Sequence, residues 1–235
     1  MAGYFLAPTA TKIPPEARGE VLLTGSHGGA YVGYLAARAG LRALIASDAG
    51  IGKDEAGIGS LSLCDAVGMA CATISHDSAR IGDAEHMLAC GVVSHVNRAA
   101  AASGCTIGQS CKEALACITL APMPNGEPPV YAEARSVAGR NRHGLSLVCI
   151  DSVSLVVPED AGQIVVSGSH GALVAGQHHL AIRVQAAAAF FNDAAFGYEN
   201  VGCSRLPVLQ NRGVAAATVA AASARIGDAG STLED

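Results

Sequence analysis

The sequence predicts an α/β fold: two tandem βαβαβ repeats related by pseudo-twofold symmetry, each with a mainly parallel sheet, and a helical and hairpin insertion between the repeats. Two observations lead to this prediction. The chain repeats itself, and within each copy short apolar runs alternate with helix-like segments. With 235 residues, of which 50% are hydrophobic and 15% charged, the chain is long and apolar enough to bury a substantial core.

The internal repeat is anchored by two pairs of matching segments. Residues 24–29 (TGSHGG) return as residues 167–172 (SGSHGA), 143 positions later. Residues 78–84 (SARIGDA) return unchanged as residues 223–229, 145 positions later. Two additional residues therefore enter the second copy between the anchors, and chance does not produce such a series.

Each copy is expected to run strand, helix, strand, helix, strand. Short continuous apolar runs joined by helices are typical of parallel strands that are buried on both faces and connected by right-handed crossovers. In the first copy the expected strands are 21–24, 41–46 and 69–74, and the expected helices are 30–38 and 54–67. In such a sheet, ligands bind beyond the carboxyl ends of the strands.

The stretch between the copies differs in kind. Residues 84–103 and 111–120 are helix-like, and residues 122–129 form a proline-rich loop. Residues 130–137 and 145–157 are expected to pair as a hairpin around a basic turn.

These features divide the chain into three expected parts: a first repeat with its following helix (1–104), a helical and hairpin insertion (105–156) and a second repeat (157–235). Because few residues follow Asp228, we expect the second copy to lack the helix that follows the first. The two halves should therefore be related but unequal.

Composition excludes several classes of partner. A formal charge of −5 offers no basic surface for nucleic acid. No apolar run approaches the roughly 18 residues of a membrane span, and the N-terminus lacks the order of a secretory signal, so we expect a cytoplasmic protein that binds no membrane. The eight cysteines lie mostly in alanine-rich segments, where free thiols are expected. The low charged fraction favours a homo-oligomer that covers apolar surface.

Polar residues that could carry chemistry follow the three expected strands of the first copy. Because the carboxyl ends of parallel strands share one edge of a sheet, these side chains should converge in one pocket. The alternative is that small polar residues belong in any loop between a strand and a helix. The candidates at this edge are Ser26, His27, Asp48, Ser75, His76, Asp77, Ser78, Arg80 and Asp83.

The first of these loops is glycine-rich. Gly25, Gly28 and Gly29 have no side chains, so their backbone could approach a carboxylate, a small phosphate or an oxyanion closely. The turn lacks the GxGxxG spacing of dinucleotide folds and the Lys-Ser/Thr end of a phosphate-binding loop. We therefore expect it to bind substrate and expect no nucleotide cofactor.

Histidine supplies the candidate acid and base groups, because its ordinary pKa of about 6.5 lies near neutrality. His27 and His170 occupy equivalent positions in the two copies. His76 and Asp77, by contrast, correspond to alanines in the second copy, which favours one complete site over two. His27, Asp48, His76 and Asp77 are also residue types that bind divalent metals, but their spacing matches no metal motif. We therefore assign no metal ligands and keep a divalent ion only as an alternative.

Arg80 recurs as Arg225 in an identical context. Each arginine could pair with the nearby Asp83 or Asp228 and hold a loop in shape. Each could equally hold a substrate carboxylate in its planar fork. Arg80 is therefore a candidate substrate-binding residue.

The leading functional hypothesis is a hydrolase that cleaves C–N (amide-type) bonds in a small polar or carboxylate metabolite. His27 would act as acid and base, Asp48 and Asp77 would orient the reacting groups, and Arg80 would bind substrate. Ser75 or Ser78 could meet His27 across the edge as a nucleophile.

Two alternatives remain. One is a racemase or isomerase in which His27 and His170 act as a paired acid and base from the two halves. The other is a non-catalytic ligand-binding or oligomeric scaffold protein whose repeat only builds a symmetric framework.

Overall fold

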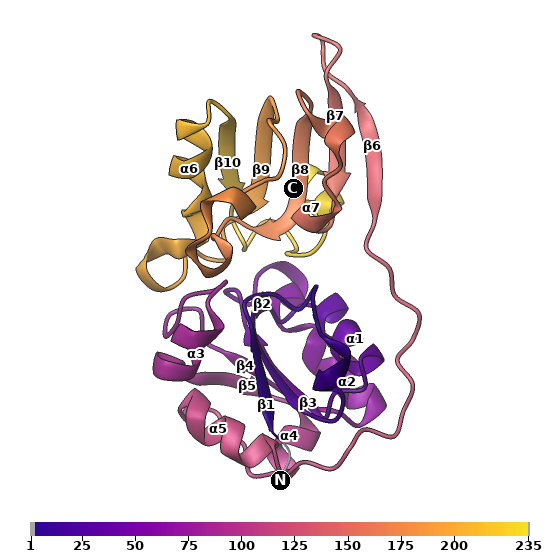
Figure 1. The fold of residues 1–235 in the computed structure, drawn as a ribbon, viewed down its shortest axis with the longest axis vertical. Helices are drawn as coiled ribbons and strands as arrows, with labels where there is room; N and C mark the ends of the chain where they lie inside the picture. The colour runs from indigo at the N-terminus through magenta and orange to yellow at the C-terminus, as the bar shows by residue number, and fades with distance from the viewer. Residues whose placement is uncertain (1–2, 235) are drawn as a thin grey trace.

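The computed structural model describes residues 3–234 and consists of two lobes, each built on one five-stranded sheet (Figure 1). The expected α/β fold with two tandem repeats is confirmed, because both sheets are mainly parallel and helices connect their strands. The loops that follow the parallel strands of one lobe face those of the other lobe. None of the helices in residues 3–234 has the length and apolar character needed to cross a membrane.

In the first lobe four parallel strands are extended by one antiparallel strand. In spatial order the strands are β1 (Tyr4–Ala7), β2 (Val21–His27), β3 (Ala43–Ser47), β4 (Ala70–Ile74) and the antiparallel β5 (Val93–Val96). One face of this sheet is covered by α1 (Ala30–Arg38) and α2 (Ser60–Val67), and the other by α3 (Ala84–Cys90), α4 (Arg98–Ala102) and α5 (Cys111–Ile118). Alternate residues of the buried strands enter the two cores, as the continuous apolar runs predict.

In the second lobe the strand order is β10-β9-β8-β7-β6. The strands are β6 (Arg135–Arg140), β7 (Ser146–Ile150), β8 (Ile164–His170), β9 (Ala188–Asn192) and β10 (Ala215–Val219), and all pairs are parallel except the β6–β7 hairpin. The helices are α6 (Arg205–Asn211) and α7 (Ala229–Glu234). In place of α1, this lobe has two short 3-10 turns, Val174–Gly176 and His178–Leu180.

Several elements differ from the sequence-based expectation. The second copy does have a helix after Asp228: α7 occupies the position of α3, and the Oδ1 atom of Asp228 accepts a hydrogen bond from the Ser231 amide at its N-terminus. The expected helix over 84–103 is interrupted by β5. The expected helix over 54–67 begins as a 3-10 turn, and only its second half is α-helical.

The segment expected as an insertion, 105–156, contributes to both lobes. Its helix α5 buries Cys111, Leu115 and Ile118 in the core of the first lobe. Its hairpin forms one edge of the second sheet. The loop between them runs along the outside of both lobes (Figure 1). The eight cysteines form no disulfide, as expected.

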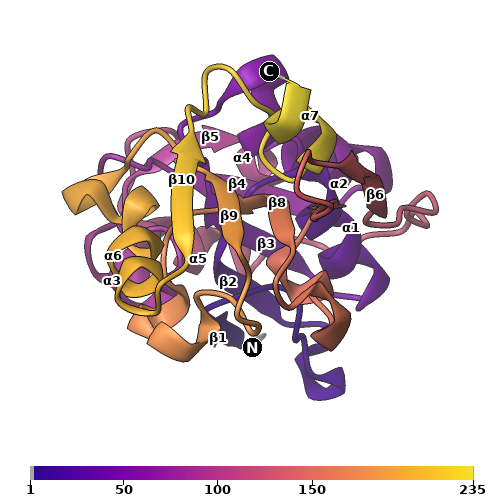
Figure 2. The same ribbon diagram turned by 90° about the horizontal axis from the view of Figure 1, so that it is seen from above.

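The two lobes join through reciprocal contacts between equivalent residues. The amide of Lys53 donates a hydrogen bond to the carbonyl of Ala221 (2.8 Å), and the amide of Tyr198 donates to the carbonyl of His76 (2.6 Å). The two donors, Lys53 and Tyr198, are 145 residues apart, and so are the two acceptors, His76 and Ala221. Exchanging the lobes therefore converts one bond into the other. Seen from above, the second lobe is stacked over the first (Figure 2). The duplication therefore generates its own pseudo-twofold interface.

Candidate functional site

A cavity of about 130 Å³ lies between the lobes, where the loops after their strands meet. Its walls carry similar groups from both halves. The first lobe contributes Thr9, Thr11, Lys12, Ser26 and His27, and the second contributes Ser152, Ser154, Ser169, His170, Arg183 and Arg205. We call this cavity the inter-lobe pocket.

His27 stands at the end of β2 and is half-buried, with Gly227 of the second lobe against its ring. The amide of Gly29 donates a hydrogen bond to its Nδ1 atom (3.1 Å), so the neutral ring carries its proton on Nε2. The Cε1 atom of His27 faces Gly227 of the second lobe: a Cβ atom added to Gly227 would lie 3.3 Å from it. Burial lowers the pKa of His27 to about 4. The imidazole is therefore neutral at pH 7.

His170 holds the equivalent position at the end of β8 and is only 6% exposed. Burial lowers its pKa well below the ordinary value, and the positive charges of Arg205 and His27 act in the same direction. A backbone hydrogen bond with Ala172 opposes this shift, but no group of residues 3–234 completes a hydrogen bond to the buried Nδ1 atom of His170. The two histidines thus share one environment, and one of them has a polar atom without a protein partner.

Arg205 is a buried cation beside His170. It is 1% exposed, and its guanidinium donates hydrogen bonds to the carbonyls of Ala172, Leu180 and Ala181. The guanidinium also lies 5.0 Å above the ring of Phe191. Burial lowers its pKa to about 10, so it remains charged at pH 7. A fixed positive charge at this place favours an anionic ligand.

Arg205 was not among the residues predicted from the sequence. The sequence does contain a signal for it: the equivalent residue of the first copy is Ser60, so the second copy has a charged side chain where the first has a hydroxyl group. Two further groups of the pocket were missed although they recur between the copies. Thr9 and Thr11 place their hydroxyl groups 3.1 Å apart, and the equivalent Ser152 and Ser154 place theirs 2.8 Å apart. Each lobe therefore presents a pair of hydroxyl groups to the pocket.

Ser26 lines the pocket, but its hydroxyl oxygen accepts a hydrogen bond from the amide of Ala10 (2.9 Å). The equivalent Ser169 accepts one from the amide of Val153 (2.9 Å). Both serines therefore hold the loop that follows the neighbouring strand. This use explains their recurrence without a nucleophilic role.

The glycine turn is explained mainly by close packing. The amide of Gly28 donates to the carbonyl of Ser47 (2.6 Å), and that of Gly29 donates to His27, so these amides already have partners. A Cβ atom on Gly25 would lie 2.6 Å from the backbone of Gly82. The turn therefore requires glycine because other backbone segments approach it.

Asp48 and His76 form a hydrogen-bonded pair outside the inter-lobe pocket. Oδ1 of Asp48 accepts bonds from the amide and from Nδ1 of His76, both at 2.9 Å, and from the amide of Gly50 (3.1 Å). The bond to Asp48 raises the pKa of His76. Burial alone would raise the pKa of Asp48, but its hydrogen bonds from His76 and Gly50 lower it. Asp77 is exposed, 3.5 Å from Nε2 of His76.

The second lobe indicates what Asp48 does. Its counterpart Asp193 accepts hydrogen bonds from the amides of Ala195 and Ala221, each at 2.8 Å. These amides are equivalent to those of Gly50 and His76. Both carboxylates therefore organise the loops at the joint between the lobes, and the His76 imidazole is an addition of the first lobe.

The remaining candidates also lie at this joint or below it, and none lines the pocket. Ser78 donates a hydrogen bond to the carbonyl of Ser75 (2.8 Å) and stabilises the loop after β4. Arg80 forms an ion pair with Glu199 of the second lobe. Asp83 caps the N-terminus of α3 by accepting a bond from the amide of His86 (2.9 Å). The structure thus brings His27 together with His170, and it places Asp48, His76, Asp77 and Arg80 elsewhere.

No group of three or more His, Cys, Asp or Glu side chains within residues 3–234 has the arrangement of a metal site. Comparison with known proteins gave no match to a family model, to a curated protein or to a solved structure.

Proposed function

We propose that this chain is an enzyme that transfers a proton at a carbon atom of a small anionic metabolite, as a racemase, epimerase or isomerase does. The observation that carries the proposal is the convergence of His27 and His170. They are equivalent residues of an internal duplication, they come from different lobes, and they line one cavity. Two acid–base groups on opposite walls suit a reaction that removes a proton on one side and returns it on the other.

The charges of the pocket support an anionic substrate. Arg205 supplies a buried positive charge, and Lys12 and Arg183 add exposed cations at the walls. Both histidines are neutral at pH 7, because burial lowers their pKa values. A bound anion provides the countercharge that allows one imidazole to hold a proton while the other accepts one. Substrate binding and proton uptake should therefore be coupled.

Hydrolysis of a C–N bond in the same pocket is the second candidate. The observation in its favour is asymmetry: Arg183 and Arg205 come from the second lobe, so the two ends of a substrate meet different groups. His27 would then activate water. The hydrogen bonds made by Ser26 and Gly28 support neither a serine nucleophile nor an oxyanion site in the glycine turn.

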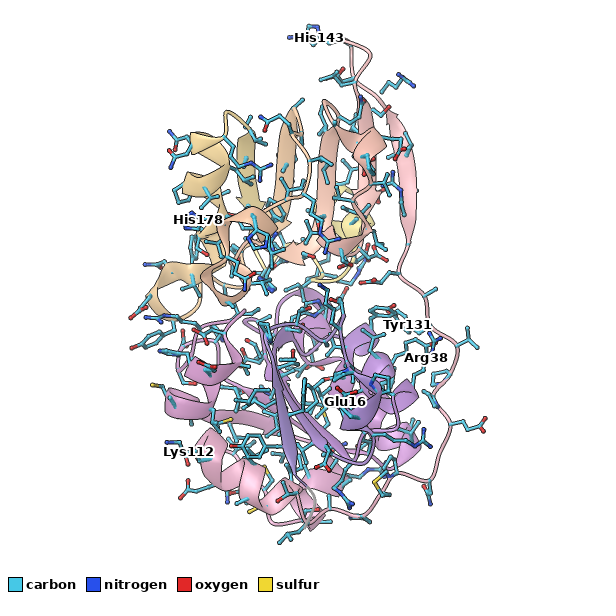
Figure 3. The ribbon with its side chains drawn as sticks, viewed as in Figure 1. Glu16, Arg38, Lys112, Tyr131, His143 and His178 are labelled. Atoms are coloured by element: carbon cyan, nitrogen blue, oxygen red, sulfur yellow. The ribbon has the colours of Figure 1, made fainter. Side chains whose placement is uncertain are left out.

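Proton exchange in D₂O distinguishes these reactions. The wild-type chain would be incubated with a panel of small 2-hydroxy, 2-amino and dicarboxylic acids and followed by ¹H NMR. We expect deuterium at a substrate carbon without bond cleavage, and a loss of exchange of at least about a hundredfold in His27→Gln and in His170→Gln. His143→Gln, at the distant hairpin tip (Figure 3), is the control.

The other outcomes each contradict the proposal. Cleavage that depends on His27 but little on His170 would support the hydrolase. Turnover that persists in both glutamine variants would remove histidine from the mechanism. A chain that binds these acids without exchange or cleavage would be a ligand-binding protein.

We also propose, from composition, a cytoplasmic homo-oligomer. The chain has few charges, and β10 is an edge strand without a charged residue or proline, which suits pairing with another copy. Light scattering at micromolar concentration tests this, and a monomer would contradict it.

A further inference from the structure

One acidic side chain of the inter-lobe pocket comes from neither repeat. Glu133 lies on the loop between α5 and β6, which passes along the outside of both lobes (Figure 1). On the first lobe this loop is attached by Tyr131, whose ring lies 5.7 Å from that of Tyr31 and 6.1 Å from that of Tyr34 (ring centroids). Figure 3 shows Tyr131 beside the first lobe, near Arg38.

On the second lobe the loop is attached one residue after Glu133. The amide of Ala134 donates a hydrogen bond to Oδ2 of Asp151 (2.7 Å), and the amide of Asp151 donates to the carbonyl of Ala134 (3.1 Å). This pairing continues the β6–β7 ladder and sets Glu133 beside Ser152. With an attachment on each side, the Glu133 side chain is held in the wall of the pocket rather than free in solvent.

The surroundings of Glu133 favour its protonated form. Burial is the main reason, and the Asp151 carboxylate is the next; together they raise the pKa of Glu133 to about 7, although a hydrogen bond with Ser152 opposes them. Asp151 itself accepts amide hydrogen bonds on both oxygens, from Ala134 and Ala229, which stabilise its charge. The other titratable or charged groups around this part of the pocket are Lys12, His27, Tyr31, Tyr131, His170, Arg183, Arg205 and Asp228.

We propose that Glu133 is the proton donor of the inter-lobe pocket and hydrogen-bonds to a carbonyl or carboxyl oxygen of the substrate. This inference rests on the proposed function. Neutral histidines are poor acids, whereas a carboxyl group placed in the same cavity can both give and recover a proton. The substrate class is then a small acid whose reacting C–H bond adjoins a carbonyl or carboxyl group.

The step balances in protons and electrons. His170, whose buried Nδ1 atom has no hydrogen-bond partner among residues 3–234, takes the proton from the substrate carbon, and the electron pair of the broken C–H bond forms a C=C bond. The electrons of the substrate C=O bond accept the Glu133 proton, which gives an enol and a Glu133 carboxylate. His27, protonated when the anion binds, returns its Nε2 proton to the opposite face, and the enol proton goes back to Glu133.

Glu133 also breaks the symmetry of the pocket. Ser152 corresponds to Thr9 in the first copy, but β1 is the edge of its sheet, and no strand within residues 3–234 pairs beyond β1 to bring an acid beside Thr9. The acid is therefore available on the side of the second lobe only. A substrate should bind with its reacting oxygen toward Ser152.

Malonate binding tests this inference before the substrate is known. Titration calorimetry would measure malonate affinity for the full chain between pH 6.5 and 8.5. We expect the wild-type affinity to fall by at least about tenfold over this range as Glu133 ionises. Glu133→Gln keeps a hydrogen-bond donor without a charge, so its affinity should fall less than that of the wild type, by only the part that proton uptake at the histidines contributes. Ser152→Ala removes the bond that lowers the Glu133 pKa, so the midpoint of the fall should move to higher pH.

A second measurement does not depend on malonate. In the ¹³C-labelled chain, the carboxyl signal that disappears in Glu133→Gln should titrate near pH 7. A titration near the ordinary value of about 4.3 would overturn the inference, and so would identical pH profiles of malonate affinity in the wild type and Glu133→Gln. If malonate does not bind at pH 6.5, the anion pocket and the proposed function fall together. If it binds with an unchanged profile in Glu133→Gln, only the role of Glu133 is lost.

Discussion

Nε of Arg80 in the first lobe lies 2.7 Å from Oε2 of Glu199 in the second. The reciprocal pair, Arg225 and Asp54, has a separation of 3.0 Å between Nη1 and Oδ2. The two arginines are 145 residues apart in the sequence, and so are the two acids, so the repeat relates one ion pair to the other. These ion pairs therefore belong to the joint that the duplication created, and they explain why the arginines recur without assigning them a ligand.

The two roles of arginine can be separated by anion binding. Arg183→Ala removes a cation at the wall of the pocket and should weaken malonate binding about three- to tenfold. Arg80→Ala removes a cation that is engaged at the joint and should leave malonate affinity unchanged. Calorimetry at pH 6.5 would measure both. An equal loss in the two variants would place Arg80 in the binding machinery after all.

The packing of the glycine turn predicts a stability effect. In Gly25→Ala the new Cβ atom would lie 2.6 Å from the carbonyl carbon of Gly82 and 2.8 Å from the carbonyl oxygen of Pro8. Both are backbone atoms, so the free energy of unfolding should fall by about 1–3 kcal/mol. Gly162→Ala is the matched control: it meets no atom within 4 Å and should cost only about 1 kcal/mol for its positive φ. Urea denaturation would compare them, and similar losses would refute the packing explanation.

Much of each lobe could be predicted because its signals are local. The apolar run that begins at Val21 and the alanine-rich segment Ala30–Arg38 place β2 and α1, and the structure gives α1 those bounds. The motif repeated at Ser167 places β8 in the same way. The four-residue β1 was missed because a run so short has no periodicity.

The site was harder to predict because it depends on how the lobes meet. His27 and Asp48 both follow parallel strands of the first sheet. Nothing in the first copy alone indicates that, once the second lobe is in place, His27 lines the inter-lobe pocket and Asp48 lies outside it. The contacts that do so, such as that between Lys53 and Ala221, are backbone hydrogen bonds that leave no side-chain signature. Glu133 lies in a loop without periodicity, so no sequence signal distinguishes it from the exposed acids of other loops.

The Asp48–His76 pair predicts a pH-dependent joint. The bond to Asp48 raises the pKa of His76 in the folded state, so its stabilisation is complete below the ordinary value near 6.5 and is lost as pH rises through the higher folded value. The melting temperature should therefore differ more between the wild type and His76→Ala at pH 6 than at pH 8.5. Alanine is a tolerated replacement, because Ala221 occupies the equivalent position. A difference that grows with pH would contradict the pairing.

The buried histidines predict the opposite behaviour in acid. Burial lowers the pKa of His27 from 6.5 to about 4, so the unfolded chain binds a proton in this range that the folded chain does not. Unfolding free energy should therefore fall as pH decreases below 6.5, by up to about 3 kcal/mol at pH 4 from His27 alone, at roughly 1.4 kcal/mol per unit. His170, whose pKa is also lowered, should add to this loss.

Glutamine cannot take up this proton, so His27→Gln with His170→Gln should remove most of the histidine-dependent loss. Urea denaturation of the wild type and the double variant at pH 7 and pH 4.5 measures the difference directly, because carboxylates that protonate in this range do so in both chains. His143→Gln, whose exposed side chain has no comparable burial, should follow the wild type. If the double variant lost as much stability in acid as the wild type, the two imidazoles would not be desolvated, and their convergence in a closed pocket would be wrong.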